Sequence, residues 1–400
     1  MKTDKFVLIL GAGYEQLPIY HLCIKKSLKI LAVDKNISAP GLKFADYKII
    51  TSIRRDKNLV KKIIKSKKNI VAVLTMANDI PLIQYKISKA LNLRGISATA
   101  ARLCSDKALF YKKFSKERFN IPNYIEVSKE NYNINNLKFP LIYKPRDGRG
   151  SRGVYYIKNK KNIKSYLDAS FKTTEKKTII LQEYISGAQF STESLIYKKK
   201  IYTSIGLRNY KDTRYLLPNI IENGGYNPAP ISLALELKIN QLLLKIAKVL
   251  KIKEGPLKCD LVINKDKIFL LEAAPRFGGG YVASHITEIL YNCNFLENYL
   301  NILLNNKIDK INFIKKKLFV FVRFIFSKKK GKIKKIINSN LNDIKKNIIH
   351  SVFFKKKGSI LDDPKSHADR IGYVSTFHQN KNTALKIANK FVSRIRIITS

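Results

Sequence analysis

Residues 139–153 read Phe-Pro-Leu-Ile-Tyr-Lys-Pro-Arg-Asp-Gly-Arg-Gly-Ser-Arg-Gly, an apolar strand pattern that ends at Lys144 and leads directly into a glycine-rich loop. Glycine lets backbone N–H groups turn toward a phosphate without a clash from a Cβ atom. The loop lacks the Gly-Lys-Ser/Thr ending of a P-loop, yet three glycines and two arginines within residues 147–153 make it long for an ordinary hairpin turn. We therefore expect a phosphate-binding element that consists of Lys144, Gly148, Arg149, Gly150, Ser151 and Gly153.

A second apolar run, residues 268–272, ends in the carboxylate of Glu272 and is followed by Arg276. The preceding segment 264–267 has the composition of a hairpin turn, and the strand pattern before that turn carries Asp260. Neighbouring antiparallel strands would place the two carboxylates side by side, where oxygen ligands suit Mg²⁺ bound to phosphates. The alternative for each acid is a half-buried carboxylate satisfied by a lysine. The guanidinium could hold a carboxylate or a transferred phosphoryl group.

Two further segments complete this set of elements. Lys107, in Ser-Asp-Lys-Ala-Leu-Phe (105–110), supplies a second lysine, although a solvated helix lysine is the plainer interpretation in so lysine-rich a chain. The run Leu181-Gln-Glu-Tyr-Ile185 ends a strand pattern, and the backbone at a strand edge can hydrogen-bond an adenine ring. Together, the order and spacing of these elements predict binding and cleavage of MgATP.

Length and charge restrict the class of protein. A chain of 400 residues is too long for one ordinary core, so we expect about two or three domains. The net charge of +48 is typical of proteins that bind nucleic acids or membrane surfaces. However, lysine is spread along the whole chain together with Ile, Asn and Tyr, all of which A/T-rich codons favour. We therefore expect no specific nucleic-acid partner.

The cysteines and the apolar runs indicate the compartment. The cysteines are far apart and form no Cys-x-x-Cys pair, which argues against zinc and redox motifs and favours a reducing cytoplasm. No uninterrupted apolar run of about 18 residues exists, so no membrane span is predicted. The N-terminus reads as a first strand and not as a secretion signal.

The pattern divides the chain into three sections. Residues 1–103 alternate strand and helix patterns, which predicts an α/β domain with a parallel sheet and helices on both faces. Residues 104–306 have a mixed α+β pattern. Residues 307–400 have a smaller α+β pattern, in which we interpret the lysine-rich tract 328–357 as a hairpin and a helix.

The first section also carries a partial dinucleotide fingerprint. Gly11-Ala-Gly13 lacks the third glycine, and Asp34 stands where a ribose-binding acid would. A tight strand-to-helix turn is the simpler explanation, because the candidate ATP-binding elements lie elsewhere.

With these residues in view, the chain resembles the ATP-grasp superfamily of carboxylate–amine (or thiol) ligases, over nearly its whole length. The ATP-site resemblance rests on segments 105–107, 143–145, 147–153, 182–185 and 272–276. Ala368-Asp-Arg-Ile-Gly372 and the helix pattern at Ala384 look like the C-terminal lid of the biotin-carboxylase-like branch. The resemblance implies a Rossmann-like pre-ATP-grasp domain at 1–103, a two-lobed ATP-grasp domain at 104–306 and a lid-like domain at 307–400.

The same resemblance implies a role for each residue. Lys107 and Lys144 would contact phosphates, and Arg276 would act with Lys144 in catalysis by stabilising an acyl phosphate. The remaining roles are adenine binding by Glu183 and Ile185, ribose contact by Gln189, and Mg²⁺ (or Mn²⁺) binding by Asp260 and Glu272. Many members have Asn where this chain has Ala274, which leaves a third metal ligand unassigned.

The implied activity is an ATP-dependent joining of a small-molecule carboxylate to an amine, with ADP and phosphate released. We expect a cytoplasmic enzyme, with a homodimer as the candidate assembly. One alternative is a purine-pathway carboxylase or formyl-group enzyme, but those resemble Pro-His-x-x-Gly after the arginine, whereas this chain has Phe277-Gly-Gly-Gly. Another alternative is a non-catalytic protein that binds nucleotides or polyanions.

Overall fold

The computed structural model describes residues 4–131, 133–161, 163–174, 176–306, 308, 310–338 and 341–400. The N-terminal section is a parallel sheet in the strand order β3-β2-β1-β4. Its central strand β1 is apolar and buried at every position, as expected for a parallel strand that is covered on both faces. The elements are β1 (Phe6–Leu10), α1 (Leu17–Lys25), β2 (Lys29–Asp34), β3 (Tyr47–Ile50), α2 (Leu59–Lys65), β4 (Ile70–Leu74) and α3 (Pro81–Ala90).

The turn after β1 is held by Asp34, whose carboxylate accepts the N–H of Ala12 at 2.8 Å. The acid at the end of β2 thus stabilises the tight strand-to-helix turn. This geometry agrees with the simpler explanation of the Gly-Ala-Gly motif.

A small antiparallel sheet follows, in the order β5-β8-β6-β7. One of its faces packs against α6 in a separate apolar cluster. Strand β6 carries Lys144 near its end, directly before the glycine-rich loop. The elements of this region are α4 (Ala98–Leu103), α5 (Lys107–Lys116), β5 (Tyr124–Val127), β6 (Leu141–Pro145), β7 (Tyr155–Ile157), α6 (Ile163–Phe171) and β8 (Ile179–Glu183).

The largest sheet has eight strands in the order β13-β12-β9-β10-β11-β14-β18-β16. Successive side chains of a strand point to opposite faces. On β12, Cys259 and Leu261 therefore join the apolar cluster under α7, while Lys258 and Asp260 face the other way, toward the cavity described below. The central elements are β9 (Ala188–Tyr197), β10 (Lys200–Arg208), β11 (Gly225–Asn227), α7 (Leu233–Val249), β12 (Gly255–Asn264) and β13 (Lys267–Ala274).

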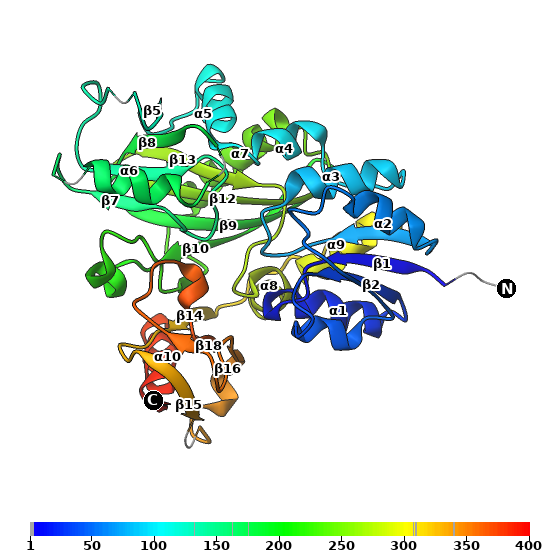
Figure 1. Ribbon diagram of the computed structural model, residues 1–400. Coiled ribbons are helices and arrows are strands. Elements are labelled where there is room, and N and C mark those ends of the chain that lie inside the picture. The colour runs from blue at the N-terminus through cyan, green and yellow to red at the C-terminus, as the bar shows by residue number, and fades with distance from the viewer. Residues whose placement is uncertain are drawn as a thin grey trace.

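The eight-stranded sheet continues into the C-terminal section, because β11 pairs with β14. It therefore spans the predicted division near residue 306, and residue 307 lies outside the described residues. Figure 1 shows the C-terminal section (orange to red) below the central sheet and the N-terminal sheet (blue) beside it. The C-terminal elements are β14 (Phe319–Ile325), β15 (Gly331–Asn338), β16 (Ile348–Phe353), β17 (Ile360–Leu361), β18 (Gly372–His378), α10 (Lys381–Ser393) and β19 (Ile395–Thr399).

The prediction of a hairpin and a helix over 328–357 is wrong. Strand β15 pairs with β17 and β19, and β16 pairs with β18, so the two strands within this tract are not partners. Between them lies a short 3₁₀ turn at Lys345–Asn347, within the described part of the tract. In β15 the exposed Lys332 and Lys334 flank the buried Ile333, which is the pattern of a strand with one solvated face.

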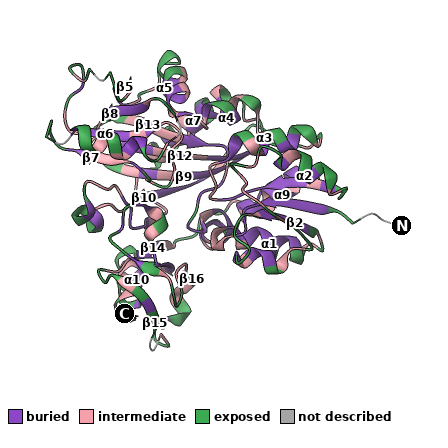
Figure 2. Cartoon of the chain, in the orientation of Figure 1, coloured by how far each residue is buried: buried purple, intermediate pink, exposed green. Residues whose placement is uncertain are grey.

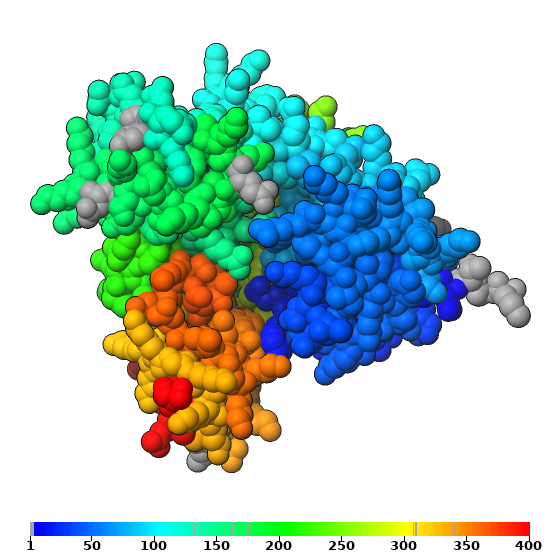
Figure 3. All heavy atoms as spheres, in the orientation of Figure 1, coloured from blue at the N-terminus to red at the C-terminus, as the bar shows by residue number. Residues whose placement is uncertain are grey.

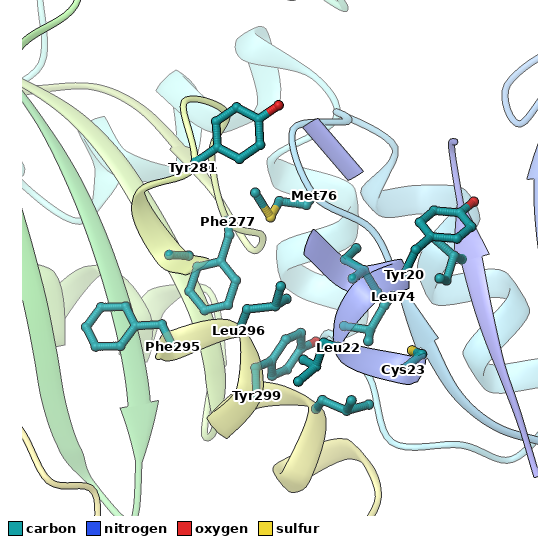
Figure 4. Packing of buried hydrophobic residues seen from close by; sticks show 14 of the residues in the cluster. Tyr20, Leu22, Cys23, Leu74, Met76, Phe277, Tyr281, Phe295, Leu296 and Tyr299 are labelled. Carbon is teal, nitrogen blue, oxygen red and sulfur yellow. The ribbon is translucent and has the colours of Figure 1, made fainter. Parts of the chain in front are cut away.

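The N-terminal sheet packs tightly on the segment after β13. Tyr20 of α1 and Met76 after β4 share one buried cluster with Phe277, Tyr281 and the helix that follows. Figure 4 shows these side chains facing one another across the junction, and Figure 2 shows the buried strands beneath exposed outer helix faces. The segment contains a π-helical turn (Val282–Ile286), α8 (Thr287–Tyr291) and α9 (Phe295–Leu303). None of the described helices is long and apolar enough to cross a membrane.

Candidate active site

A cavity of about 630 Å³ lies where the three sections of the chain meet (Figure 3). Its walls include residues of the turns that follow the N-terminal strands, of both central sheets and of the C-terminal section. Two sequence-predicted residues, Gly153 and Glu183, do not line it. The sequence-predicted residues that do are Lys107, Lys144, Gly148, Arg149, Gly150, Ser151, Ile185, Gln189, Asp260, Glu272 and Arg276.

Lys107 is placed by the start of α5. Asp106 caps this helix by accepting the N–H groups of Ala108 and Leu109, and it also forms a two-point ion pair with Arg146 at 2.7 and 3.0 Å. The lysine ammonium donates to the carbonyl of Gly148 at 2.7 Å and lies 3.4 Å from a Glu272 carboxylate oxygen. Lys107 is therefore a fixed side chain between the glycine loop and β13, not a solvated helix lysine.

Lys144 projects into the cavity from β6. Burial lowers the pKa of Lys144 to about 8, although the charge of Glu272 acts in the opposite direction. Within the described residues, no carboxylate lies within 4 Å of its ammonium. Such a buried cation is predisposed to bind an anion, because a negative ligand would offset the cost of its desolvation.

The glycine loop contacts the C-terminal section directly. The backbone N–H of His367 donates to the carbonyl of Gly150 at 3.1 Å, and the Ser151 hydroxyl lies 3.3 Å from Nε2 of the same histidine. Gly153 has a φ of +68°, and a Cβ there would collide with Thr173. Gly153 therefore shapes the loop from outside the cavity and does not line it.

The strand end that is predicted to bind adenine borders the cavity. Ile185 and Gln189 line the cavity, as does Gln182. The Glu183 carboxylate instead accepts hydrogen bonds from Asn123 at 3.0 Å and from the backbone N–H of Lys138 at 2.8 Å. Because successive strand residues face opposite sides, Gln182 lines the cavity while the Glu183 side chain is engaged away from it.

Asp260 and Glu272 occupy directly opposite positions on β12 and β13. Asp260 accepts hydrogen bonds from Arg208 at 3.0 Å and from Lys258 at 2.5 Å. Burial would raise the pKa of this carboxyl, but these two cations hold it far below its usual range. The pair supplies the hard oxygen atoms that Mg²⁺ requires. The described residues contain no group of three or more His, Cys, Asp or Glu side chains that could hold a metal, so other ligands would have to complete the site.

Arg276 forms an ion pair across the junction of two sections. Its guanidinium donates through Nε to Asp79 at 2.7 Å, and a second nitrogen of the same group contacts the same oxygen. Burial raises the pKa of Asp79, but Arg276 outweighs it and holds that pKa below its usual value. Asp79 follows β4 in the N-terminal section, some 200 positions from its partner in the sequence, so no local pattern indicated the pair.

A buried ion network that the sequence did not reveal crosses the cavity wall. Glu222 accepts hydrogen bonds from Arg208 at 2.8 Å and from Arg370 at 2.9 Å. Burial opposes ionisation of Glu222, but the two arginines lower its pKa to about 2. Through Arg208 the network reaches Asp260, and through Arg370 it reaches the C-terminal section. Of this network outside Asp260, only Arg370 lies in a segment that the sequence singled out, namely residues 368–372, which resemble a C-terminal lid.

Comparison with known proteins identifies two regions of the chain. Residues 104–280 match the ATP-grasp domain, and residues 323–400 match the L-amino acid ligase C-terminal domain 2. A formate-dependent phosphoribosylglycinamide formyltransferase of Prochlorococcus marinus is 21% identical over 99% of this chain and 98% of its own. A D-alanine–D-alanine ligase of Bacillus cereus is 30% identical, over 28% of this chain and 38% of its own.

Solved structures share the fold over the whole chain. An L-amino acid ligase from Bacillus licheniformis superposes with a TM-score of 0.83 at 20% identity, with full coverage of both chains. A phosphoribosylglycinamide synthetase from Anaerococcus prevotii superposes with a TM-score of 0.75 at 22% identity, over 99% of this chain and all of that one.

Proposed function

Because the chain is an ATP-grasp protein, with its ATP-grasp domain at residues 104–280, we propose that it is an ATP-dependent ligase for amino acids. It joins the carboxylate of one to an amine through an acyl phosphate and releases ADP and phosphate. The observation that carries this proposal is that two lysines, a glycine loop, two opposed carboxylates and an arginine line one and the same cavity. The match of the C-terminal section to an L-amino acid ligase domain supports amino acids as substrates.

The phosphate end of the cavity is formed by Lys107, Lys144 and the glycine loop. Both ammonium groups neutralise the charge of a triphosphate, and Lys144 does so without a competing carboxylate within ion-pair distance in the described part of the chain. The contact of His367 with Gly150 ties the loop to the C-terminal section. Closure of both over bound nucleotide would exclude water from a reactive intermediate.

Asp260 and Glu272 are the residues that would hold Mg²⁺, which would supply positive charge to offset that of the phosphates. The substrate carboxylate attacks the γ-phosphorus, and the bond to the β-phosphate oxygen breaks with its electron pair. Arg276 lies beside the same strands and would hold the acyl phosphate. An amine then attacks the acyl carbon and releases inorganic phosphate.

The test is ADP release by the purified protein with MgATP and amino acids supplied singly and in pairs. We expect ADP to form in step with a condensed product for particular pairs. Glu272→Ala is expected to abolish turnover and keep the fold, whereas Glu117→Ala, which removes an exposed acid of the ion pair with Lys113, should keep turnover. Normal activity of Glu272→Ala would contradict the proposed metal site.

A purine-pathway activity is the competing outcome of the same assay. Phosphoribosylglycinamide with formate serves as the alternative substrate pair, because a full-length relative is named for that reaction. ADP release with this pair alone would replace the amino acid proposal.

We also propose a cytoplasmic location and a homodimer. The four cysteines are free thiols, three of them buried, which supports a reducing compartment. Sedimentation analysis of the purified protein tests the dimer, and a monomer at micromolar concentration would contradict it.

A further inference from the structure

The carboxyl groups on the cavity wall fall into two kinds. Among the described residues, six carboxyl side chains line the cavity. Four of them form ion pairs with arginine or lysine, namely Asp79, Glu222, Asp260 and Glu272. The other two, Glu15 and Glu193, have no cation within 4 Å in the described part of the chain. They accept only backbone N–H groups of the glycine turn 278–280.

Glu193 lies beside the reacting end of the cavity. In the register of β9, β12 and β13, Asp260 stands opposite both Ser191 and Glu272. The next row on the same face contains Glu193 opposite Lys258. Glu193 is two residues along β9 from Ser191, the partner of Asp260, and two residues along a strand correspond to roughly 7 Å. The Glu193 carboxyl therefore lies one pair of residues along the sheet from the carboxylates that would hold the metal.

The backbone of the glycine turn 278–280 contacts the Glu193 carboxyl directly. Both Glu193 oxygens accept the N–H of Gly278, at 2.9 and 3.0 Å, and a Cβ at position 278 would collide with Oε1 of Glu193. Arg276, two residues earlier, is the proposed anchor of the acyl phosphate. Glu193 is 3% exposed, so the lone pairs not used by Gly278 face only the protein interior and the cavity.

The protonation of Glu193 suits proton transfer near neutral pH. Burial raises its pKa to about 7, against the opposing effects of the Gly278 N–H and of the charges on Lys258, Arg276 and Arg208. These cations face it from β12, from the turn after β13 and from β10. A general base is most effective when its pKa lies near the working pH.

We propose that Glu193 is the proton acceptor for the amine nucleophile, an assignment that rests on the proposed ligase function. The ammonium form of the amine gives one proton to the Glu193 carboxylate. The freed nitrogen lone pair then forms the C–N bond at the acyl carbon, and the acyl carbon–oxygen bond to the phosphate breaks with its electron pair. The nitrogen loses its second proton to the departing phosphate, so the products are a neutral amide and hydrogen phosphate. Glu193 is thus a catalytic residue for the second half-reaction only.

Glu193→Gln separates this role from a structural one, because the amide oxygen can still accept the Gly278 N–H. We expect the rate of ligation with an amino acid amine to fall by about 100-fold or more. Acyl phosphate formation, trapped with hydroxylamine in place of the amine, should stay within a few-fold of the wild-type rate, because hydroxylamine is unprotonated at neutral pH. Thermal unfolding with and without MgATP serves as the check on folding.

The pH profile gives a second, independent readout. The kcat/KM of the wild-type enzyme should decrease as the pH falls below about 7. This decrease should be absent in Glu193→Gln, which has no carboxylate to protonate, and partly present in Glu193→Asp. Glu15→Gln is the matched comparison, since Glu15 is also a buried carboxyl held by the glycine turn, through Gly280 at 3.0 Å. Absence of this decrease in Glu15→Gln instead would overturn the assignment.

The outcomes distinguish this inference from the proposed function. Equal loss of ligation and hydroxamate formation in Glu193→Gln would show a structural role and contradict the inference. Retention of both activities would also contradict it, while leaving the ligase function intact. Absence of hydroxamate from the wild-type enzyme with every acid would contradict the ligase function itself.

Discussion

In the folded chain, the side chain of Lys144 is enclosed by strand β6 and the cavity walls, without a carboxylate within 4 Å of its ammonium in the described structure. A native pKa of about 8 against the ordinary 10.5 means that the unfolded chain binds more protons than the native one between these values. Stability contributed by this site therefore rises with pH across that window. Below about pH 8 the buried charge costs at most roughly 3 kcal/mol.

Lys144→Met tests whether the Lys144 ammonium lowers the stability of the fold but is needed to bind MgATP. At pH 7 we expect the free energy of unfolding to increase by roughly 1–3 kcal/mol, because an uncharged side chain of similar length replaces a desolvated ammonium. MgATP should raise the melting temperature of the wild type but not of the variant. Lys158→Met, at an exposed lysine, is the control for loss of charge alone. A destabilised Lys144→Met that still binds MgATP would contradict the assignment.

The sequence predicted some of the site residues and missed others, for physical reasons that differ from residue to residue. Lys144, Asp260 and Glu272 were predicted to face the site because each sits on a strand whose pattern and neighbouring turn are local. The ion pair of Arg276 with Asp79 was missed because it depends on the docking of two sections. Adenine binding at Glu183 stays a prediction about the strand edge, and the alternation of strand faces puts the Gln182 side chain, not that of Glu183, on the cavity wall.

Among the elements, helix α5 fixes the phosphate end through its first turn. Its cap, Asp106, is 8% exposed and joins Arg146 to the helix N-terminus. The first helical residue is Lys107, so the cap also sets the position of its ammonium against Gly148. A change at the cap is therefore expected to affect both stability and nucleotide binding.

Asp106→Asn tests this coupling. Asn still caps the helix, but the largely buried guanidinium of Arg146 loses a charged partner. We expect a loss of about 1–3 kcal/mol in stability and a higher KM for ATP. Glu126→Gln removes only the exposed partner of the same arginine, so its cost should stay below about 1 kcal/mol. Equal effects of the two substitutions in chemical denaturation would contradict the special role of the cap.

Elements with a strong local pattern were predicted closely. The apolar run at residues 6–10 is enough by itself to indicate strand β1, and the helical spacing of apolar residues over 232–251 indicates α7. The prediction for the C-terminal tract 328–357 failed because its local pattern of lysine, isoleucine and turn residues does not indicate which strands pair with one another. Strand pairing across β15, β17 and β19 is a property of the tertiary fold and not of the tract itself.

At the scale of the whole molecule, His21, His285 and His350 interact electrostatically where the three sections join. His285 after β13 and His350 of β16 have ring centroids 5.0 Å apart, and Tyr281 packs on both. Burial, the mutual charge of this pair and the charge of His21 from α1 lower the pKa of His350 to about 4. The native chain thus binds fewer protons here than the unfolded chain between about pH 4 and 6.5, so stability at this junction is lost on acidification through that window.

His350→Phe should reduce this acid sensitivity. A phenyl ring keeps the packing with Tyr281 but has no proton to gain. We expect the melting temperature to fall less between pH 7 and pH 5 in the variant than in the wild type. His378→Phe, outside this cluster, is the control. An unchanged pH dependence in His350→Phe would show that the junction does not sense pH.

The central claim, that an acyl phosphate links ATP cleavage to bond formation, has one direct test. The acid substrate is labelled with ¹⁸O in its carboxylate, and the inorganic phosphate released during ligation is analysed by mass spectrometry. We predict that each phosphate carries one ¹⁸O atom from the carboxylate, because that oxygen attacks the γ-phosphorus and leaves with it. Unlabelled phosphate released together with a condensed product would show that no acyl phosphate forms.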